Sequence, residues 1–338
     1  MEVIAVTNAP SDAFDVVVIG GGAAGLSGAL TLVRARRKVV VLDAGQPRNA
    51  PANAVHGLLG LDGTSPADLL ERGRAEVTGY GGEVVSGEVE TVVRGGDGFV
   101  VTVADGRTVR ARRLLVATGL VDERPDIPGL WARWDRDVVH CPYCHGWEVR
   151  DQAVGVLATG PMSLHQALLF TQWTDDVTFF SRATSLTEEQ SEQLAARRIQ
   201  VLVGEVASLE IADNRLVGVR LASGAVVARE AVAVSPRMVA RAGFLAGLGI
   251  QPTSHPMGEY IEADRTGRTA VPGVWVAGNV TDLAAQVGAA AAAGAFAATQ
   301  INADLVTEDT DKSVRAMRDD EPIALAYRES AHRSERTQ

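Results

Sequence analysis

Residues 15–28, DVVVIGGGAAGLSG, decide the fold that we expect. A short β-branched run ends in three glycines, an alanine- and leucine-rich segment follows, and a second β-branched run, KVVVLD, occupies residues 38–43. This order is typical of a strand, a tight turn, a helix and a second strand, which together form a βαβ unit. We therefore predict an α/β protein that opens with a dinucleotide-binding unit.

The glycines of this stretch follow the spacing Gly20-x-Gly22-x-x-Gly25. The first permits a tight turn, the second lets the backbone approach a pyrophosphate, and the third allows close packing of the helix on the strand. Ala23 and Ala24 open the helix, whose positive dipole end would face the phosphates. The motif therefore predicts a bound dinucleotide.

Three other segments narrow the choice of dinucleotide. Asp43 ends the second strand, where a carboxylate accepts hydrogen bonds from ribose hydroxyls and repels a 2′-phosphate, so FAD or NAD is favoured over NADP. The run LLVATG (114–119) ends in small residues that let a loop pass close to a cofactor: Ala117, Thr118 and Gly119. In VPGVWVAGNV (271–280), Gly278 and Asn279 precede a helix and offer a second site for phosphate or ribitol, which favours FAD.

The rest of the chain contains a second unit of the same kind. We predict a hairpin over 98–119 with a turn at Asp105-Gly106, a linker over 121–130, and a second strand–helix–strand unit over 153–182. Further strands are expected over 200–234 and 273–280, followed by a helix of small residues to about 302. From about 305 the chain is charged without an apolar period, which indicates a partly mobile tail.

Composition excludes several classes of protein. The 338 residues carry a net charge of −10 with a pI of about 5.2, which argues against nucleic acid or an anionic membrane as partner. The N-terminus lacks a secretory signal, and no run of about 18 apolar residues is present. We expect a cytoplasmic protein of two domains.

Cys141 and Cys144 are the only cysteines, and they lie between His140 and His145. In a reducing cytosol a C-x-x-C pair is more often catalytic than structural. A zinc site would need both histidines as ligands, and their adjacency to the cysteines strains a tetrahedral arrangement. Two inert buried cysteines are a further alternative. We favour a redox pair, with no metal.

Taken together, these motifs resemble the low-molecular-weight thioredoxin reductase family of flavoproteins over roughly residues 14–303. The order GGGAAG, ATG, C-x-x-C, second nucleotide unit and AGNV carries the resemblance. It implies two Rossmann-like domains, with a discontinuous FAD domain (1–121 and 250–338) and an inserted NAD(P)H-type domain (122–249) that carries the cysteines. It also implies a homodimer, flavin contacts by Gln286 and Val287, a flavin-proximal Cys144 and an outer Cys141 that meets the substrate.

The chain departs from the family in two places. His145 stands where the family has an aspartate, and a histidine suits proton transfer near neutrality, with His140 as the weaker candidate. The second glycine turn reads Ala158-Thr-Gly-Pro161-Met162, and only Arg182 remains of a cluster that would hold a 2′-phosphate. Nicotinamide binding is therefore expected to be degraded.

Without NADPH, a dithiol substrate must supply the electrons. The chain resembles the disulfide-forming branch of the family, which includes the dithiol oxidases of gliotoxin and holomycin biosynthesis. The resemblance implies an antibiotic-biosynthesis enzyme that passes electrons from a small-molecule dithiol through Cys141–Cys144 and FAD to oxygen, with hydrogen peroxide formed. An NADPH-dependent thioredoxin reductase and a redox-sensing flavoprotein are the alternatives.

Overall fold

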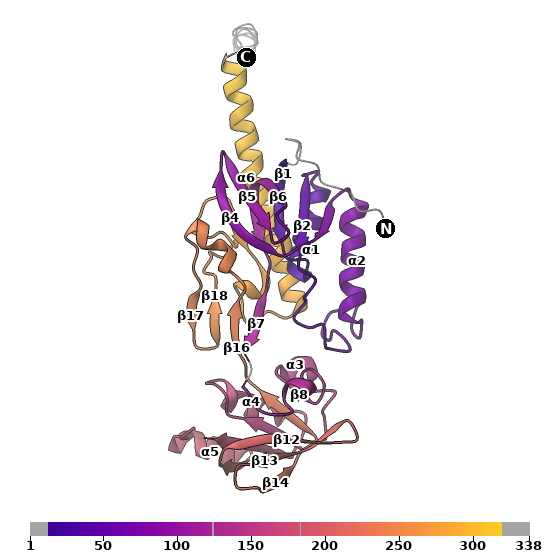
Figure 1. Cartoon of the computed structure of the whole chain (residues 1–338), viewed down its shortest axis with the longest axis vertical. Coiled ribbons are helices and arrows are strands. Elements are labelled where there is room, and N and C mark those ends of the chain that lie inside the picture. The colour runs from indigo at the N-terminus through magenta and orange to yellow at the C-terminus, as the bar shows by residue number, and fades with distance from the viewer. Residues whose placement is uncertain (1–12, 124, 183, 320–338) are drawn as a thin grey trace, which may run out of the picture.

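The computed structural model describes residues 13–123, 125–182 and 184–319. The chain forms two lobes joined by a narrow waist, and one long helix projects from the larger lobe (Figure 1). The α/β architecture expected from the sequence is confirmed.

The larger lobe is built on a sheet with the strand order β3-β2-β1-β6-β5-β4, to which β19 adds by pairing with β6. β1, β2, β3, β6 and β19 run parallel, as expected for βαβ units, and β4–β5–β6 form antiparallel hairpins. The elements are β1 (Ala13–Ile19), α1 (Ala23–Arg34), β2 (Val39–Asp43), α2 (Pro66–Gly79), β3 (Glu83–Ser86), β4 (Val89–Gly95), β5 (Gly98–Val103), β6 (Thr108–Val116), β19 (Val274–Val276) and α6 (Val287–Asp319).

Apolar residues on both faces of β1 explain its central position. Val16 and Val18 pack toward α1 and α6, whereas Val17 and Ile19 pack against the opposite core. Small residues let α1 and α6 approach closely, because a Cβ built on Gly294 would lie 1.9 Å from the main-chain oxygen of Ala24. This packing holds the start of α1, and with it the glycine turn, against the sheet.

The smaller lobe contains a parallel sheet of order β11-β10-β9-β15-β8 and an antiparallel sheet of β12, β13 and β14. Its elements are η1 (Trp131–Arg133), β8 (Val138–Val139), α3 (Pro142–His145), β9 (Val154–Leu157), α4 (Ser163–Phe170), β10 (Val177–Arg182), α5 (Glu188–Ala196), β11 (Gln200–Val203), β12 (Val206–Ala212), β13 (Arg215–Leu221), β14 (Val226–Ala228) and β15 (Ala231–Val234). The predicted second strand–helix–strand unit is β9–α4–β10.

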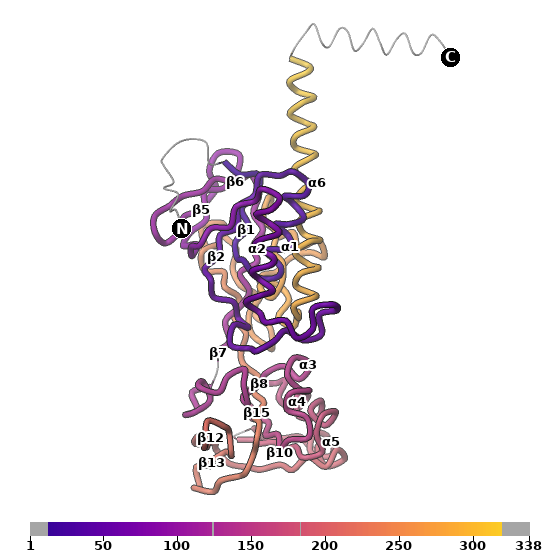
Figure 2. The backbone as a smooth tube through the Cα atoms, turned by 90° about the vertical axis from the view of Figure 1, so that its right-hand side faces the viewer, coloured from indigo at the N-terminus to yellow at the C-terminus, as the bar shows by residue number. Residues whose placement is uncertain are grey.

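Two neighbouring strands carry the chain through the waist (Figure 2). β7 (Leu120–Glu123) leads into the smaller lobe, and β16 (Arg237–Ala240) returns and pairs with it antiparallel. They form a small sheet with β17 (Thr253–His255) and β18 (Gly258–Tyr260), and η2 (Gly243–Leu248) follows β16. Because Ala242 and Leu245 belong to the core of the larger lobe, we propose that the second domain boundary lies before β16 and not at residue 250.

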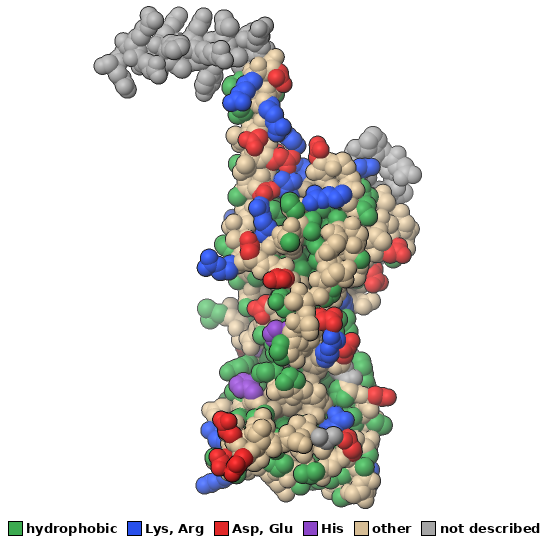
Figure 3. Space-filling model, turned by 90° about the vertical axis from the view of Figure 1, so that its left-hand side faces the viewer, with side chains coloured by type: hydrophobic (Ala, Val, Ile, Leu, Met, Phe, Trp, Pro, Cys, Tyr) green, Lys and Arg blue, Asp and Glu red, His purple; other side chains and the backbone are tan. Residues whose placement is uncertain are grey.

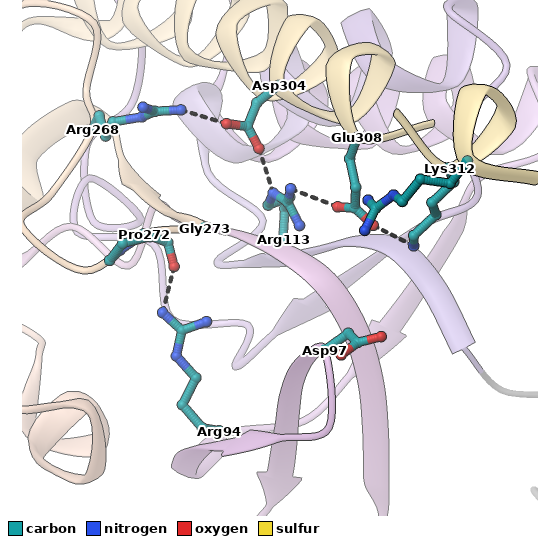
Figure 4. Close-up of a pocket in the computed structure, with 10 residues that line it drawn as sticks. Arg94, Asp97, Arg113, Arg268, Pro272, Gly273, Asp304, Glu308 and Lys312 are labelled. Carbon is teal, nitrogen blue, oxygen red and sulfur yellow. Dashed lines mark hydrogen bonds and ion pairs between the residues drawn. The ribbon is translucent and has the colours of Figure 1, made fainter. Parts of the chain in front are cut away.

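The expectation of a mobile tail from about residue 305 was wrong for residues 305–319, which continue α6 to Asp319. Ion pairs fix its middle turns to the sheet: Arg113 of β6 contacts Asp304 and Glu308, both at 2.6 Å. These residues line a cavity of about 440 Å³ beside α6 (Figure 4). Ion pairs thus hold this part of α6 against the sheet in place of the apolar stripe that the sequence lacks. Residues 320–338, the rest of the predicted tail, lie outside the described residues.

The surface carries interspersed charges of both signs along the larger lobe and α6 (Figure 3). Across residues 13–123, 125–182 and 184–319, no helix combines the length and apolar character needed to cross a membrane.

Candidate active site between the two lobes

A cavity of about 1170 Å³ lies where the two lobes meet. It exceeds the roughly 300–1,000 Å³ of most small-molecule sites, which suits an extended dinucleotide. The larger lobe contributes most of the predicted cofactor residues to its wall: Gly20, Gly22, Ala23, Ala24, Asp43, Ala117, Thr118, Gly119, Gly278, Asn279, Gln286 and Val287. The smaller lobe contributes His140, Cys144 and His145. Gly25 and Cys141 do not line the cavity.

The glycine turn has the form that a pyrophosphate requires. Gly20 has φ +107°, and a Cβ there would lie 2.4 Å from the main-chain oxygen of Ala117. A Cβ on Gly25 would lie 1.9 Å from the oxygen of Gly20, so this glycine permits the close helix–strand packing. A Cβ on Gly22, which lines the cavity, would meet no atom of the described part of the chain within 4 Å. The turn therefore leaves open the space into which a phosphate fits.

Asp43 lies at the end of β2 beside this turn. Its Oδ1 accepts hydrogen bonds from the amides of Gly21, at 3.2 Å, and Gly45, at 3.1 Å. These bonds orient the carboxylate, whose Oδ2 lies 4.0 Å from Nη1 of Arg74. The arrangement fits a ribose hydroxyl donating to the carboxylate, as predicted from the sequence.

The loop before α6 supplies the opposite wall. Gly278 has φ +74°, which favours glycine, and it begins η3 (Gly278–Val280). Nδ2 of Asn279 donates to the main-chain oxygens of Asp282 and Ala285, both at 2.9 Å. The Asn279 side chain therefore shapes the loop that leads to Gln286 and to the first amides of α6.

Cys141 and Cys144 form a disulfide. Cys141 is the N-cap of α3, and its Sγ accepts a hydrogen bond from the Cys144 amide at 3.2 Å. Pro142 occupies the first helical position, where its missing N–H costs nothing. Among the described residues, Cys144 lines the cavity and Cys141 does not, and we propose on this ground that Cys144 is the inner sulfur and Cys141 the outer one.

The two histidines have different surroundings. Burial, followed by the electrostatic effect of His140, lowers the pKa of His145 below its ordinary value of 6.5, and its buried Nδ1 has no hydrogen-bond partner among the described residues. Neutral His145 is therefore available as a proton acceptor near pH 7. The two rings lie 6.1 Å apart, centroid to centroid.

Asp135 is a residue of this site that the sequence did not single out. Its buried carboxylate lies 3.3 Å from Nδ1 of His140, and the His140 ring stacks on Trp134 with centroids 5.5 Å apart. Nε2 of Gln166 donates to the main-chain oxygen of His140 at 2.8 Å. Asp135 is five residues before His140, and nothing in the local sequence distinguishes it from a surface acid.

The second glycine turn is closed by the chain's own side chains. Oγ of Ser163 accepts hydrogen bonds from the amides of Thr159, at 3.1 Å, and Gly160, at 3.2 Å. These are the amides that a bound phosphate would need. Arg182 pairs instead with Glu205 at 3.5 Å. The turn and the surviving arginine are thus both engaged within the protein.

Comparisons with known proteins agree with this arrangement. The model of the family described as pyridine nucleotide-disulphide oxidoreductase matches residues 14–296. Thioredoxin reductase tcpT of Claviceps purpurea (strain 20.1) is 32% identical over 317 residues, covering 87% of this chain and 96% of that protein. The crystal structure of HlmI is 49% identical with a TM-score of 0.87, covering 91% of this chain and 97% of that one. An oxidoreductase from Agrobacterium tumefaciens is 34% identical with a TM-score of 0.82, covering 87% of this chain and 99% of that one.

Proposed function

Because the chain belongs to the pyridine nucleotide-disulphide oxidoreductase family, we propose that it is an FAD-dependent dithiol oxidase that closes a disulfide within a small molecule. The broader assignment, an FAD-binding oxidoreductase similar to thioredoxin reductases, follows from its relatives. Oxidation of a dithiol, oxygen as the acceptor and the small-molecule substrate are the proposal.

The state of the second glycine turn carries this proposal. NADPH would have to displace Ser163 from the amides of Thr159 and Gly160 and separate Arg182 from Glu205. Pro161 also removes one amide donor from the turn. Each loss weakens the charge-assisted contacts on which a dinucleotide phosphate depends. A chain that keeps the dithiol but not this site needs another electron donor, and a dithiol substrate supplies two electrons.

The cysteines and histidines would perform the exchange as follows. A substrate thiolate attacks Sγ of Cys141, which breaks the Cys141–Cys144 bond and leaves the Cys144 thiolate facing the cavity. The second thiolate of the substrate then attacks the substrate sulfur that is bonded to Sγ of Cys141, which breaks that bond, releases the cyclic disulfide and leaves Cys141 as a thiolate. Two electrons and two protons have left the substrate, and His145 is the proposed proton acceptor, with His140 as second candidate.

The glycine turn, Asp43 and the loop before α6 would hold FAD, and the chemistry that FAD supplies when bound is two-electron transfer to oxygen, with hydrogen peroxide as the product. The chain's own part is to place Cys144 at the cavity wall and to keep a neutral histidine beside it.

The test is anaerobic reduction of the bound flavin by two donors separately. A small dithiol such as dithiothreitol should bleach the flavin absorbance, and air should restore it with about one hydrogen peroxide per dithiol. Micromolar NADPH should leave it unchanged. Rapid bleaching by NADPH would instead establish the alternative, an NADPH-dependent thioredoxin reductase. The homodimer and the cytoplasmic location stay predictions, and light scattering of the purified protein tests the first.

A further inference from the structure

One contact between a histidine and a carboxylate joins the two lobes at the active site. Nε2 of His56, in the loop between β2 and α2, lies 3.4 Å from Oε1 of Glu148, three residues after His145. Nδ1 of the same ring lies 3.5 Å from Oδ2 of Asp62. His56 lines the cavity, so the pair lies at its rim.

Among the residues that the structure describes, no other contact of this kind links the two lobes. There, His56–Glu148 is the one contact within 4 Å between a basic and an acidic side chain that links residues 13–121 with residues 125–235. Of the ion pairs near the waist, Arg48–Asp122 holds β7 to the larger lobe, and Arg237–Glu123 joins the two waist strands to each other. Within the described residues, the smaller lobe is therefore connected to the larger lobe by the two waist strands and, near the cysteines, by the contact of His56 with Glu148.

The loop that carries His56 is itself fixed. Oδ1 of Asp62 accepts a hydrogen bond from the Gly57 amide at 2.8 Å, and Val55 pairs with Thr64 across the loop base. The carboxylate of Asp62 thus both shapes the loop and faces the His56 ring. On the other side, the main chain of Val149 bonds to His145, so Glu148 moves with α3 and its cysteines.

We propose that His56 and Glu148 are positioning residues that hold the smaller lobe in the arrangement in which Cys144 faces the cofactor cavity. In the proposed reaction, the disulfide receives electrons from a small molecule at Cys141 and passes them on at Cys144. Keeping this arrangement of the lobes leaves Cys144 beside the cofactor cavity for the second transfer. This role rests on the proposed function, whereas the positioning itself rests on the contacts alone.

The experiment measures the exposure of Cys144 directly, in FAD-loaded protein. In a Cys141→Ser background Cys144 is the single thiol, and its reaction with a bulky maleimide reports how often the lobes separate. His56→Ala and Glu148→Gln should each raise the alkylation rate about two- to fivefold, the range expected for a partly exposed ion pair.

A charge-swapped double variant separates positioning from loop damage. His56→Glu alone should raise the rate, and adding Glu148→Arg should restore it toward that of the parent. His255→Ala, a histidine change on β17 away from the cavity, is the matched control and should leave the rate unchanged. Equal rates in the parent, His56→Ala and Glu148→Gln would overturn the proposal, and so would a double variant that stays fast. Because no substrate is present, failure here is distinct from failure of dithiol oxidation.

Discussion

Gly22→Ala tests where the cofactor's pyrophosphate lies. A Cβ at Gly22 meets no protein atom within 4 Å, and its φ of −80° is one that alanine adopts freely. Alanine is somewhat poorer than glycine as an N-cap, so the free energy of unfolding of the apoprotein should change by less than about 1 kcal/mol. The added methyl group nevertheless enters the cavity that Gly22 lines.

The expected loss of FAD affinity follows from this placement. A methyl group that pushes a phosphate away from the turn weakens at least one backbone hydrogen bond to a charged group, worth about 1.5–3 kcal/mol. Since about 1.4 kcal/mol is tenfold in affinity, FAD should bind roughly 10- to 100-fold more weakly.

Titration of the apoprotein with FAD, followed by flavin fluorescence, measures the affinity, and urea unfolding measures the stability. Gly160→Ala at the second turn is the matched control, because its Cβ would lie 3.8 Å from the nearest atom and away from the FAD site. Gly20→Ala should instead destabilise the fold by about 1–2 kcal/mol or more, given its positive φ and the contact with Ala117. Unchanged FAD affinity in a folded Gly22→Ala protein would refute this placement of the pyrophosphate.

His145→Ala should slow dithiol oxidation about 100-fold while FAD stays bound. Because burial lowers the pKa of His145 in the folded protein below 6.5, its contribution to stability is lost as the pH falls below 6.5. The free energy of unfolding should therefore differ less between pH 5 and pH 7 in the variant than in the parent, and equal differences in the two proteins would contradict this. Burial alone would raise the pKa of Glu308, but its lysine and arginine contacts outweigh this and lower the pKa from 4.5 to about 2. Glu308→Gln should therefore cost about 1 kcal/mol of unfolding free energy at pH 7 and less as the pH falls from 4.5 toward 2; a constant loss across urea denaturations at pH 3–7 would argue against the ion pairs. Gly294→Ala should cost about 1–3 kcal/mol by urea denaturation because its Cβ overlaps the main chain of α1, whereas Gly288→Ala on the open face of α6 should not; equal stabilities would mean that the helices can separate without cost.

The first glycine stretch could be predicted in detail because each of its glycines has a local reason. Positive φ at Gly20 and close packing at Gly25 are encoded by residue type at fixed spacing, and the strand and helix follow from apolar patterning. The redox pair of cysteines was predicted from chain order and resemblance, and the structure contains a Cys141–Cys144 disulfide. The inner position of Cys144 stays a prediction, and its place in the cavity wall supports it.

The remaining features depend on residues far apart in the chain. The continuation of α6 rests on ion pairs such as Arg113 with Glu308, which are 195 residues apart in the chain. Because such partners are not visible locally, the charged run without an apolar stripe led to the prediction of a tail. Likewise, Glu148 gained a role only when tertiary packing brought its carboxylate to His56 of the other lobe. Asp135 is close to His140 in the chain, but only the fold shows that its buried carboxylate faces that ring. Local sequence specifies turns and strands, whereas partners across lobes are fixed by the fold.

The closure of the second glycine turn also bears on how this chain could evolve. Ser163 satisfies two amides of the turn, and on the same short helix Gln166 holds the main chain of His140 while accepting a hydrogen bond from Ser235 at 3.2 Å. To free these amides for a nucleotide phosphate, Ser163 would have to move, and a shift of its helix would also weaken the hydrogen bond from Gln166 to the main chain of His140. Binding of a nicotinamide dinucleotide at this turn would therefore need several coordinated substitutions, and a change at Ser163 alone would alter the helix that also supports His140.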